Sequence, residues 1–274
     1  MFHQNPVYPI MEIELSIYDC GKDMYFCQMQ IFKGLFKKNN SKADFSALGT
    51  DMHSHLIPAV DDGSESIDDS IRFIESLILL GYRKIITTPH IMGDFYKNTP
   101  EIIHSGLDSL RRALLEKGIE IPIEAAAEYY LDYEFTQKIK SEKLLTFGKN
   151  YLLFEISYMN LPENLSETIF QLQLAGYKPV LAHPERYPFW WNKFNEYEKL
   201  KEAGVLFQIN LNSLTGYYSA GAKQTAEKLI EMDMVEFAGT DLHHNKHLDS
   251  LRSAGMKDHF GKLIASGKLL NPFL

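Results

Sequence analysis

His53 and His55 are separated by a single residue, and the acidic pair Asp61 and Asp62 follows them closely. In an extended strand, alternate side chains project from the same face, so the two imidazoles can reach one ion. Imidazole nitrogens with carboxylates nearby suit a divalent ion such as Zn²⁺, Mn²⁺ or Fe²⁺. A pair of this kind is also common among surface and core histidines. The metal hypothesis therefore depends on whether similar residues recur along the chain.

Further histidines and acidic residues do recur, each at the end of a short apolar run. Together they give nine candidate metal ligands: His53, His55, Asp62, His90, Glu128, Glu155, His183, Asp241 and His243. Asp61 is an alternative to Asp62, and for His90 or Glu155 taken singly the sequence favours a buried structural residue. Nine ligands exceed the need of one ion and predict two or three ions, roughly 3.5–4 Å apart, that share a bridging carboxylate.

The sequence offers no competing nucleophile motif. Neither Cys20 nor Cys27 is followed six positions later by arginine, and glycine-rich phosphate loops and the Gly-x-Ser-x-Gly motif are absent. A metal-bound hydroxide is therefore the expected nucleophile, because bound cations lower the pKa of water toward about 7. Arg186, three residues after His183, is expected to bind an anionic substrate; a structural ion pair is the alternative.

From residue 49 onward, apolar strand patterns alternate with helical patterns. The helical spacings include Ile67 to Ile78, Leu107 to Leu114, Ile169 to Leu174 and Ala226 to Ile230, with one more helix ending at Gly204. Seven strands are expected, over residues 50–53, 84–88, 121–125, 151–155, 179–182, 205–210 and 235–239.

Apolar strands separated by helices predict a parallel sheet covered by helices. An open doubly wound sheet would gather its site at one crevice. Here six of the seven strand ends carry candidate ligands, and the other strand end offers Asn210 and Asn212. This distribution favours a (β/α)₇ barrel, in which every strand end points at one mouth.

Composition narrows the range of partners and compartments. The chain has 274 residues, 45% hydrophobic and 23% charged, which suits a globular α/β barrel. A net charge of -8 with a pI near 5.7 argues against a nucleic-acid partner. Two cysteines are too few for a disulfide framework, no apolar run reaches the roughly 18 residues needed to span a bilayer, and no signal-peptide pattern is found, so a cytoplasmic location is expected.

Residues 1–48 differ from the rest and are expected to be a flexible N-terminal extension, leaving 49–274 as the catalytic barrel. Within the extension, residues 31–38 form a short basic amphipathic stretch, which leaves a weak contact with a membrane surface as the alternative. Met29 is an alternative start of the protein.

The motifs resemble those of the polymerase-and-histidinol-phosphatase (PHP) superfamily, and within it the bacterial tyrosine phosphatases of capsular and exopolysaccharide synthesis. The resemblance spans residue 50 to the C-terminus. It rests on Asp-Met-His-Ser-His at 51–55, Asp-Asp-Gly at 61–63, Thr-Pro-His at 88–90, Ala-Glu-Tyr-Tyr at 127–130, His-Pro-Glu-Arg-Tyr at 183–187 and Thr-Asp-Leu-His at 240–243.

The resemblance implies a distorted (β/α)₇ barrel of the PHP type, with a trinuclear cluster at the carboxyl ends of the strands. The cluster is often manganese-loaded, with Fe²⁺, Zn²⁺ or Mg²⁺ as alternatives. By position, the first ion takes His53, His55, Glu128 and Asp241; the second shares Glu128 and takes Glu155 and His183; the third takes Asp62, His90 and His243.

It further implies a protein-tyrosine phosphatase acting on a membrane-associated bacterial tyrosine kinase, at the inner face of the membrane. Arg186 and Asp61 are the expected catalytic residues, and Arg186, Tyr129 and Lys246 the expected substrate contacts. Trp190 and Trp191, with Tyr130, are further candidates to flank an aromatic leaving group. Two alternatives stay open: a small-molecule phosphatase of the histidinol-phosphatase kind, and a non-catalytic kinase-binding protein. Whether the protein forms a homo-oligomer also stays open.

The chain departs from the family pattern at two places. Ala59 stands where the family often has glycine, and residues 244–247 read His-Asn-Lys-His where an arginine is expected. The second departure leaves the second anion contact uncertain, with Lys246 as its candidate.

Overall fold

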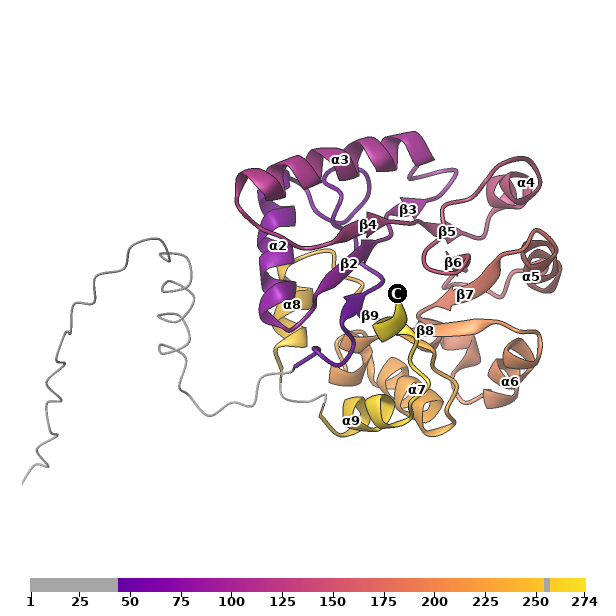
Figure 1. Cartoon of the computed structure of the whole chain (residues 1–274). Helices are drawn as coiled ribbons and strands as arrows, with labels where there is room; N and C mark the ends of the chain where they lie inside the picture. Colours follow the sequence, from indigo (N-terminus) through magenta and orange to yellow (C-terminus); the bar gives the residue numbers. More distant parts are fainter. Residues whose placement is uncertain (1–43, 254–256) are drawn as a thin grey trace, which may run out of the picture. The chain divides into compact units, whose positions relative to one another are not determined.

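The computed structural model describes residues 44–253 and 257–274 (Figure 1). The basic stretch at 31–38 and both cysteines lie outside the described residues. Phe45 and Leu48, upstream of the predicted boundary at residue 49, are fully buried. The Phe45 ring stacks on that of Tyr82, with centroids 5.6 Å apart. The packed domain therefore includes the last residues of the predicted extension.

Every strand pair in the described residues is parallel. The strands are β1 (Thr50–Asp51), β2 (Lys84–Thr87), β3 (His90–Ile91), β4 (Ile123–Ala125), β5 (Glu128–Tyr130), β6 (Tyr151–Glu155), β7 (Lys178–Ala182), β8 (Leu206–Asn210) and β9 (Phe237–Gly239). Their order is β1-β2-β4 in one sheet and β3-β5-β6-β7-β8-β9 in the other. A parallel bridge between Ser54 and Leu242 brings the chain after β9 beside the chain after β1.

Two of the seven predicted strands are each divided in two. β2 and β3 occupy one position in the barrel, interrupted at Pro89, which has no N–H to donate. β4 and β5 occupy the next position, interrupted at residues 126–127. Hydrogen bonds from Ala126 N to Thr87 O (2.9 Å) and from Glu128 N to Pro89 O (3.1 Å) carry the pairing across both breaks. Seven strand positions remain, so the predicted seven-stranded barrel is confirmed.

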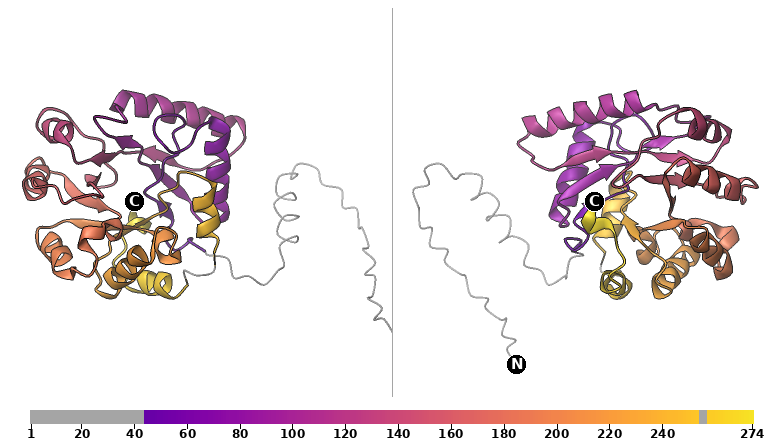
Figure 2. Two further views of the ribbon diagram at one scale, coloured as in Figure 1. Left: turned by 180° about the vertical axis from the view of Figure 1, so that it is seen from behind. Right: turned by 45° about the vertical axis from the view of Figure 1, so that its right-hand side comes forward.

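Helices cover the outside of the strands (Figures 1 and 2). The five expected helices are present as α2 (Ile67–Leu79), α3 (Pro100–Glu116), α5 (Leu165–Leu174), α6 (Phe194–Glu202) and α7 (Ala220–Glu231). The sequence analysis missed α4 (Tyr133–Ser141), α8 (Asn245–Leu251) and α9 (Lys257–Ala265). Helix α4 buries only Phe135 and Ile139, so its apolar repeat is too short to stand out.

The core has two parts, one on each side of the strands. Inward-facing side chains such as Met52, Ile86, Leu153 and Phe237 fill the barrel interior, and a larger cluster packs the helices against the strands. Near the start of β1, Asn271 donates its Nδ2 to Thr50 O (3.0 Å) and Ala238 O (2.8 Å). The C-terminal segment therefore packs on the end where the strands begin, opposite the candidate ligands. Among the residues that the structure describes, none of the helices has the length and apolar character needed to cross a bilayer.

Candidate metal centre and substrate cavity

The carboxyl ends of the strands surround a cavity of about 330 Å³. Histidine, carboxylate and tyrosine side chains form most of its wall, which consists of Asp62, His90, Tyr96, Glu128, Glu155, Tyr158, His183, Arg186, Tyr218, Asp241, His243, His244 and His247. His53 and His55 are fully buried and contact Glu128 in this wall. All nine predicted ligands therefore lie in or directly behind one cavity, although they come from segments up to 190 residues apart (53 to 243).

Ligand atoms of these residues come within 4.8 Å of one another in three groups. The groups are His53, His55, Glu128 and Asp241; His55, Asp62, His90 and His243; and His90, Glu128 and Glu155. The first matches the set expected for the first ion. In the third, His90 stands where His183 was expected. The Nε2 atom of His183 is nevertheless 3.0 Å from Glu128 Oε1 and 3.8 Å from Glu155 Oε2.

Hydrogen bonds assign the protons of the two central histidines. His53 Nδ1 lies 2.7 Å from Gln208 Oε1, and the Gln208 amide orientation is set by its Nε2 donating to Ile209 O. His55 Nδ1 lies 2.7 Å from the Asp61 carboxylate. Both Nδ1 atoms therefore donate, so in the neutral rings both Nε2 atoms carry lone pairs.

Those two lone pairs face each other and further acceptors. The Nε2 atoms are 3.3 Å apart, Glu128 Oε2 is 3.1 Å from His53 Nε2, and Asp241 Oδ1 is 3.4 Å from it. Acceptors converging without a donor between them are stable only with a cation or extra protons. The donor set of nitrogens and oxygens fits a divalent transition ion.

His90 and His243 extend the same pattern. The buried Nδ1 of His90 has no hydrogen-bond partner among the described residues, and it lies 3.3 Å from Glu128 Oε2 and 3.5 Å from Glu155 Oε1. His243 Nδ1 lies 2.9 Å from the backbone carbonyl of Asp241, so it donates and leaves Nε2 to face Asp62 Oδ1 at 3.5 Å. A second and a third ion site therefore fit these residues.

The electrostatics of the site depend on the close packing of acids and imidazoles. Burial alone would raise the pKa of Glu128, but the neighbouring His53 and His90 hold it well below its usual value. Burial and the charge of Glu128 raise the pKa of Glu155 well above its usual value. Burial, then Arg186, lowers the pKa of His183 to about 4, which keeps that imidazole neutral at neutral pH. Bound cations would favour the ionised form of the acids and replace protons in the site.

Two ligands lie in strained backbone at strand ends. His183, directly after β7, has φ 34°, and Asp241, two residues after β9, has φ 50°. Non-glycine residues rarely adopt positive φ, and such strain concentrates at functional sites. The left-handed turn at His183 starts the 3₁₀ helix η1 (Pro184–Arg186), which carries Arg186 back to the cavity.

Arg186 and Asp241 link the metal ligands to the cavity. Asp241 Oδ2 accepts from Arg186 Nη1 at 2.9 Å and from Asn210 Nδ2 at 2.6 Å, while Oδ1 faces the histidines. Arg186 therefore makes an ion pair, as the structural alternative expected, but its side chain is 24% exposed and lines the cavity. The remaining N–H groups of its guanidinium have no hydrogen-bond partner within residues 44–253 and 257–274.

Three other predicted site residues do not line the cavity. Asp61 has a fully buried side chain that accepts from His55 and from His90 N (2.9 Å), so it orients ligands instead of touching a substrate. Tyr129 follows the inward Glu128 and points to the other face, where its ring stacks on Phe135 and its hydroxyl accepts from Leu145 N. Lys246 is exposed on α8 and absent from the cavity wall. None of the three belongs to the cavity wall, so their catalytic and substrate-binding roles stay predictions from the sequence.

Trp190 and Trp191, which were predicted to flank an aromatic leaving group, also lie outside the cavity wall. Trp190 is buried in the core, and Trp191 donates its Nε1 to the carbonyl of Glu185. The aromatic wall instead consists of Tyr96, Tyr158 and Tyr218, which the sequence analysis did not single out. None of these tyrosines belongs to a motif or ends an apolar strand, so only the folded arrangement reveals them.

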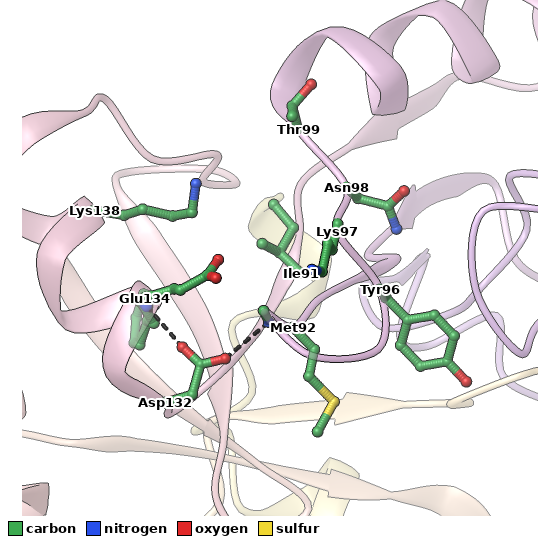
Figure 3. Close-up of a pocket in the computed structure, with 11 residues that line it drawn as sticks. Ile91, Met92, Tyr96, Lys97, Asn98, Thr99, Asp132, Glu134 and Lys138 are labelled. Carbon is green, nitrogen blue, oxygen red and sulfur yellow. Dashed lines mark hydrogen bonds between the residues drawn. The ribbon is translucent and has the colours of Figure 1, made fainter.

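A second, smaller hollow of about 80 Å³ lies between the segment after β3 and the start of α4 (Figure 3). Asp132 accepts there from Gly93 N and Phe135 N, at 2.9 and 2.7 Å. Tyr96 points away from this hollow in Figure 3, and its ring stacks on His90 at a centroid distance of 5.5 Å. Through these two hydrogen bonds, Asp132 connects the segment after β3 to the start of α4. That segment carries Tyr96, which forms part of the wall of the main cavity.

Comparisons with known proteins identify relatives of this chain. The chain is 32% identical over 197 residues to the tyrosine-protein phosphatase YwqE of Bacillus subtilis, covering 72% of this chain and 78% of that protein. It is 26% identical over 200 residues to the tyrosine-protein phosphatase CpsB of Streptococcus pneumoniae, covering 71% and 82%. Both relatives are named tyrosine-protein phosphatases, the group that the sequence motifs resemble.

A structural comparison leads to the same group. A chain from the crystal structures of YwqE from Bacillus subtilis and CpsB from Streptococcus pneumoniae, described as metal-dependent tyrosine phosphatases, superposes with a TM-score of 0.67. Sequence identity is 28%, over 79% of this chain and 85% of that chain. The family model for capsular polysaccharide synthesis, CpsB/CapC, matches residues 49–260. The chain therefore belongs to the CpsB/CapC family of capsular polysaccharide synthesis.

Proposed function

We propose that this protein is a metal-dependent protein-tyrosine phosphatase that hydrolyses phosphotyrosine in a protein substrate. The observation that carries the proposal is the convergence of nine metal-ligand candidates and Arg186 on one 330 Å³ cavity. The tyrosine specificity follows from membership of the CpsB/CapC family, whose relatives are named tyrosine-protein phosphatases.

The ligand set supports two to three divalent ions, with manganese as the proposed metal and Fe²⁺, Zn²⁺ or Mg²⁺ as alternatives. One ion is proposed at His53, His55, Glu128 and Asp241, a second at Glu128, Glu155 and His183, and a third at Asp62, His90 and His243. Bound divalent ions supply Lewis-acid stabilisation of phosphoryl charge and lower the pKa of water. Asp61 and Gln208 fix the tautomers of His55 and His53, so that both Nε2 lone pairs are ready for a cation.

Arg186 supplies positive charge at the cavity wall, next to the Asp241 oxygen that does not face His53 and His55. With Nη1 on Asp241, its remaining N–H groups are available to two phosphoryl oxygens. The negative charge on those oxygens changes in the transition state. A donor that is fixed in a partly buried cavity stabilises this charge more than water does. Arg186 is therefore proposed as the residue that binds and activates the phosphoryl group.

The proposed substrate is a tyrosine kinase of capsular or exopolysaccharide synthesis that is associated with the bacterial membrane. Tyrosine phosphorylation consumes ATP inside the cell, so the proposed place of action is the cytoplasm, at the inner membrane face. Fractionation of cells that express the protein tests this location, with detection in the cytoplasmic and peripheral membrane fractions expected.

The deciding experiment compares three substrates with and without Mn²⁺: a phosphotyrosine peptide, a generic aryl phosphate and histidinol phosphate. The proposal expects Mn²⁺-dependent turnover of the first two, with the peptide preferred. Preference for histidinol phosphate would support the small-molecule phosphatase instead. Binding of the phosphopeptide without turnover of any substrate would support a non-catalytic binding protein.

A further inference from the structure

The guanidinium of Arg186 contacts two tyrosine rings. Its Cζ atom lies 4.2 Å from the centroid of the Tyr218 ring and 5.0 Å from that of the Tyr158 ring. Tyr158 follows β6, whereas Tyr218 lies between the 3₁₀ helix η3 (Leu211–Thr215) and α7. Two separate segments therefore converge on one side chain, at distances where the ring faces attract a cation.

Each tyrosine also contacts a candidate metal ligand. The Tyr218 hydroxyl donates to Asp241 Oδ2 at 3.4 Å and accepts from Asn210 Nδ2 at 3.2 Å. The Tyr158 ring stacks on the imidazole of His183, with centroids 5.8 Å apart and an interplanar angle of 20°. The two tyrosines thus connect the arginine to two different candidate ligands, Asp241 and His183.

One edge of the guanidinium is fixed by the bond from Nη1 to Asp241 Oδ2. With that edge on a carboxylate and two rings against the group, rotation of the guanidinium is restricted. A long arginine side chain otherwise loses much rotamer freedom when it binds an anion. Restricting it before the substrate arrives lowers the entropic cost of binding.

We propose that Tyr158 and Tyr218 are positioning residues that hold Arg186 with its free N–H groups facing the phosphoryl group of the substrate. This inference rests on the proposed phosphatase function. The ring is the essential part of each tyrosine, since the contact with Arg186 is made through its face. Phenylalanine keeps that face, whereas leucine removes it.

The kinetic experiment compares leucine at both positions, and phenylalanine at position 158, in the metal-loaded full chain. Tyr218→Leu and Tyr158→Leu are expected to lower kcat/KM for an aryl phosphate and weaken inhibition by inorganic phosphate, each by roughly 3- to 30-fold, the size of a cation–π contact. Tyr158→Phe is expected to stay within about threefold of wild type. Metal content should match wild type throughout. Tyr133→Leu, which alters an exposed tyrosine on α4, is the control.

A second arm isolates the arginine. In an Arg186→Ala background, Tyr218→Leu and Tyr158→Leu should cause no further loss, because the group that they position is gone. Full additivity of the two losses would overturn the proposal. So would an equal loss in the leucine and phenylalanine variants of Tyr158, or a loss of metal in the leucine variants.

A third readout does not depend on phosphatase activity. In protein labelled with ¹⁵N-arginine and loaded with diamagnetic Zn²⁺, the Arg186 Nε–H signal, assigned by its disappearance in Arg186→Lys, should be sharp in wild type and broadened or shifted in both leucine variants. If the wild-type protein showed no turnover, the proposed function would be refuted, but the Arg186 signal could still be compared between wild type and the leucine variants. An unchanged Arg186 signal in both leucine variants would refute the positioning role alone.

Discussion

The Oδ2 atom of Asp61 lies 2.7 Å from Nδ1 of His55, and both side chains are fully buried. The same oxygen accepts from His90 N, and Oδ1 accepts from Gly63 N at 3.0 Å. Asp61 therefore fixes the tautomer of one ligand and the backbone of another. Gly63 is needed beside it, since a Cβ there would lie 2.3 Å from His55 O.

Removing the Asp61 carboxylate is therefore expected to weaken metal binding. Asp61→Ala should lower metal affinity about 10- to 100-fold, the usual cost of losing a carboxylate behind a histidine ligand. Activity should return at high Mn²⁺ concentration, because Asp61 does not line the cavity. Titration of the metal-free protein by calorimetry checks this, with the exposed Asp94→Ala as control. A kcat that stays low at saturating metal would restore the catalytic role predicted from the sequence.

His55, like His90 and Glu128, belongs to two of the three ligand groups, so its loss should strongly lower the metal content. His55→Ala is expected to lower both the metal content and the turnover, while the purified wild type carries more than one equivalent of metal. Elemental analysis measures the content, and chelator treatment of wild type should abolish turnover. At most one ion per chain, with turnover that survives the chelator, would refute the cluster.

Arg186→Ala is expected to keep its metal and lose transition-state stabilisation. The loss should be about 2–4 kcal/mol in kcat/KM, which is roughly 30- to 1,000-fold. Arg186→Lys should rescue little, because an ammonium group cannot replace a planar donor held by Asp241 and two rings. Steady-state kinetics with parallel metal analysis distinguishes the outcomes. Unchanged kinetics in the alanine variant would leave Arg186 with the structural ion pair alone.

The ligands could be predicted because each one ends a short apolar run, which is a local pattern. In a parallel barrel all such ends meet at one mouth, so fold and candidate site follow from the same repeat. Asn210, at the one strand end without a predicted ligand, instead donates to Asp241. That contact spans 31 residues and has no local signal.

Whether a residue near the strand ends reaches the cavity depends on the direction and packing of its side chain. The alternation of a strand sends Tyr129 outward once Glu128 points inward, so its packing role was accessible from the sequence. Lys246 and His247 are neighbours on α8, yet only His247 lines the cavity, because the helix turns successive side chains by different amounts. Tyr158 and Tyr218 reach Arg186 from irregular segments, whose paths no periodic pattern describes.

Ala59 occupies a backbone conformation that favours glycine. It is exposed and has φ 59°, which explains why the family often has glycine there. Ala59→Gly should stabilise the fold by up to about 1 kcal/mol, since relief of roughly 1–2 kcal/mol of strain exceeds the added entropy of the unfolded chain. Thermal or urea unfolding measures the change. Ala113→Gly, inside α3, is the contrasting variant and should destabilise by about 1 kcal/mol.

The final prediction concerns the nucleophile. The commoner tyrosine phosphatases attack with a cysteine thiolate, but the two cysteines of this chain, Cys20 and Cys27, precede the family match at residues 49–260. The described residues contain no cysteine at all. We therefore expect Cys20→Ser with Cys27→Ser to leave kcat and KM essentially unchanged, and thiol alkylation to leave the enzyme active.

An enzyme in which water attacks phosphorus directly also forms no phosphoenzyme. One displacement inverts the configuration at phosphorus, whereas a covalent intermediate requires two displacements and retains it. Hydrolysis of a chiral, isotopically labelled phosphorothioate ester is therefore expected to proceed with inversion, and rapid acid quench should trap no labelled protein. Retention of configuration, or a stoichiometric phosphorylated residue after the quench, would mean that a side chain attacks first. In that case His90, His183 and His243, not the cysteines, would be the residues to test, because they line the same cavity as Arg186 and Asp241.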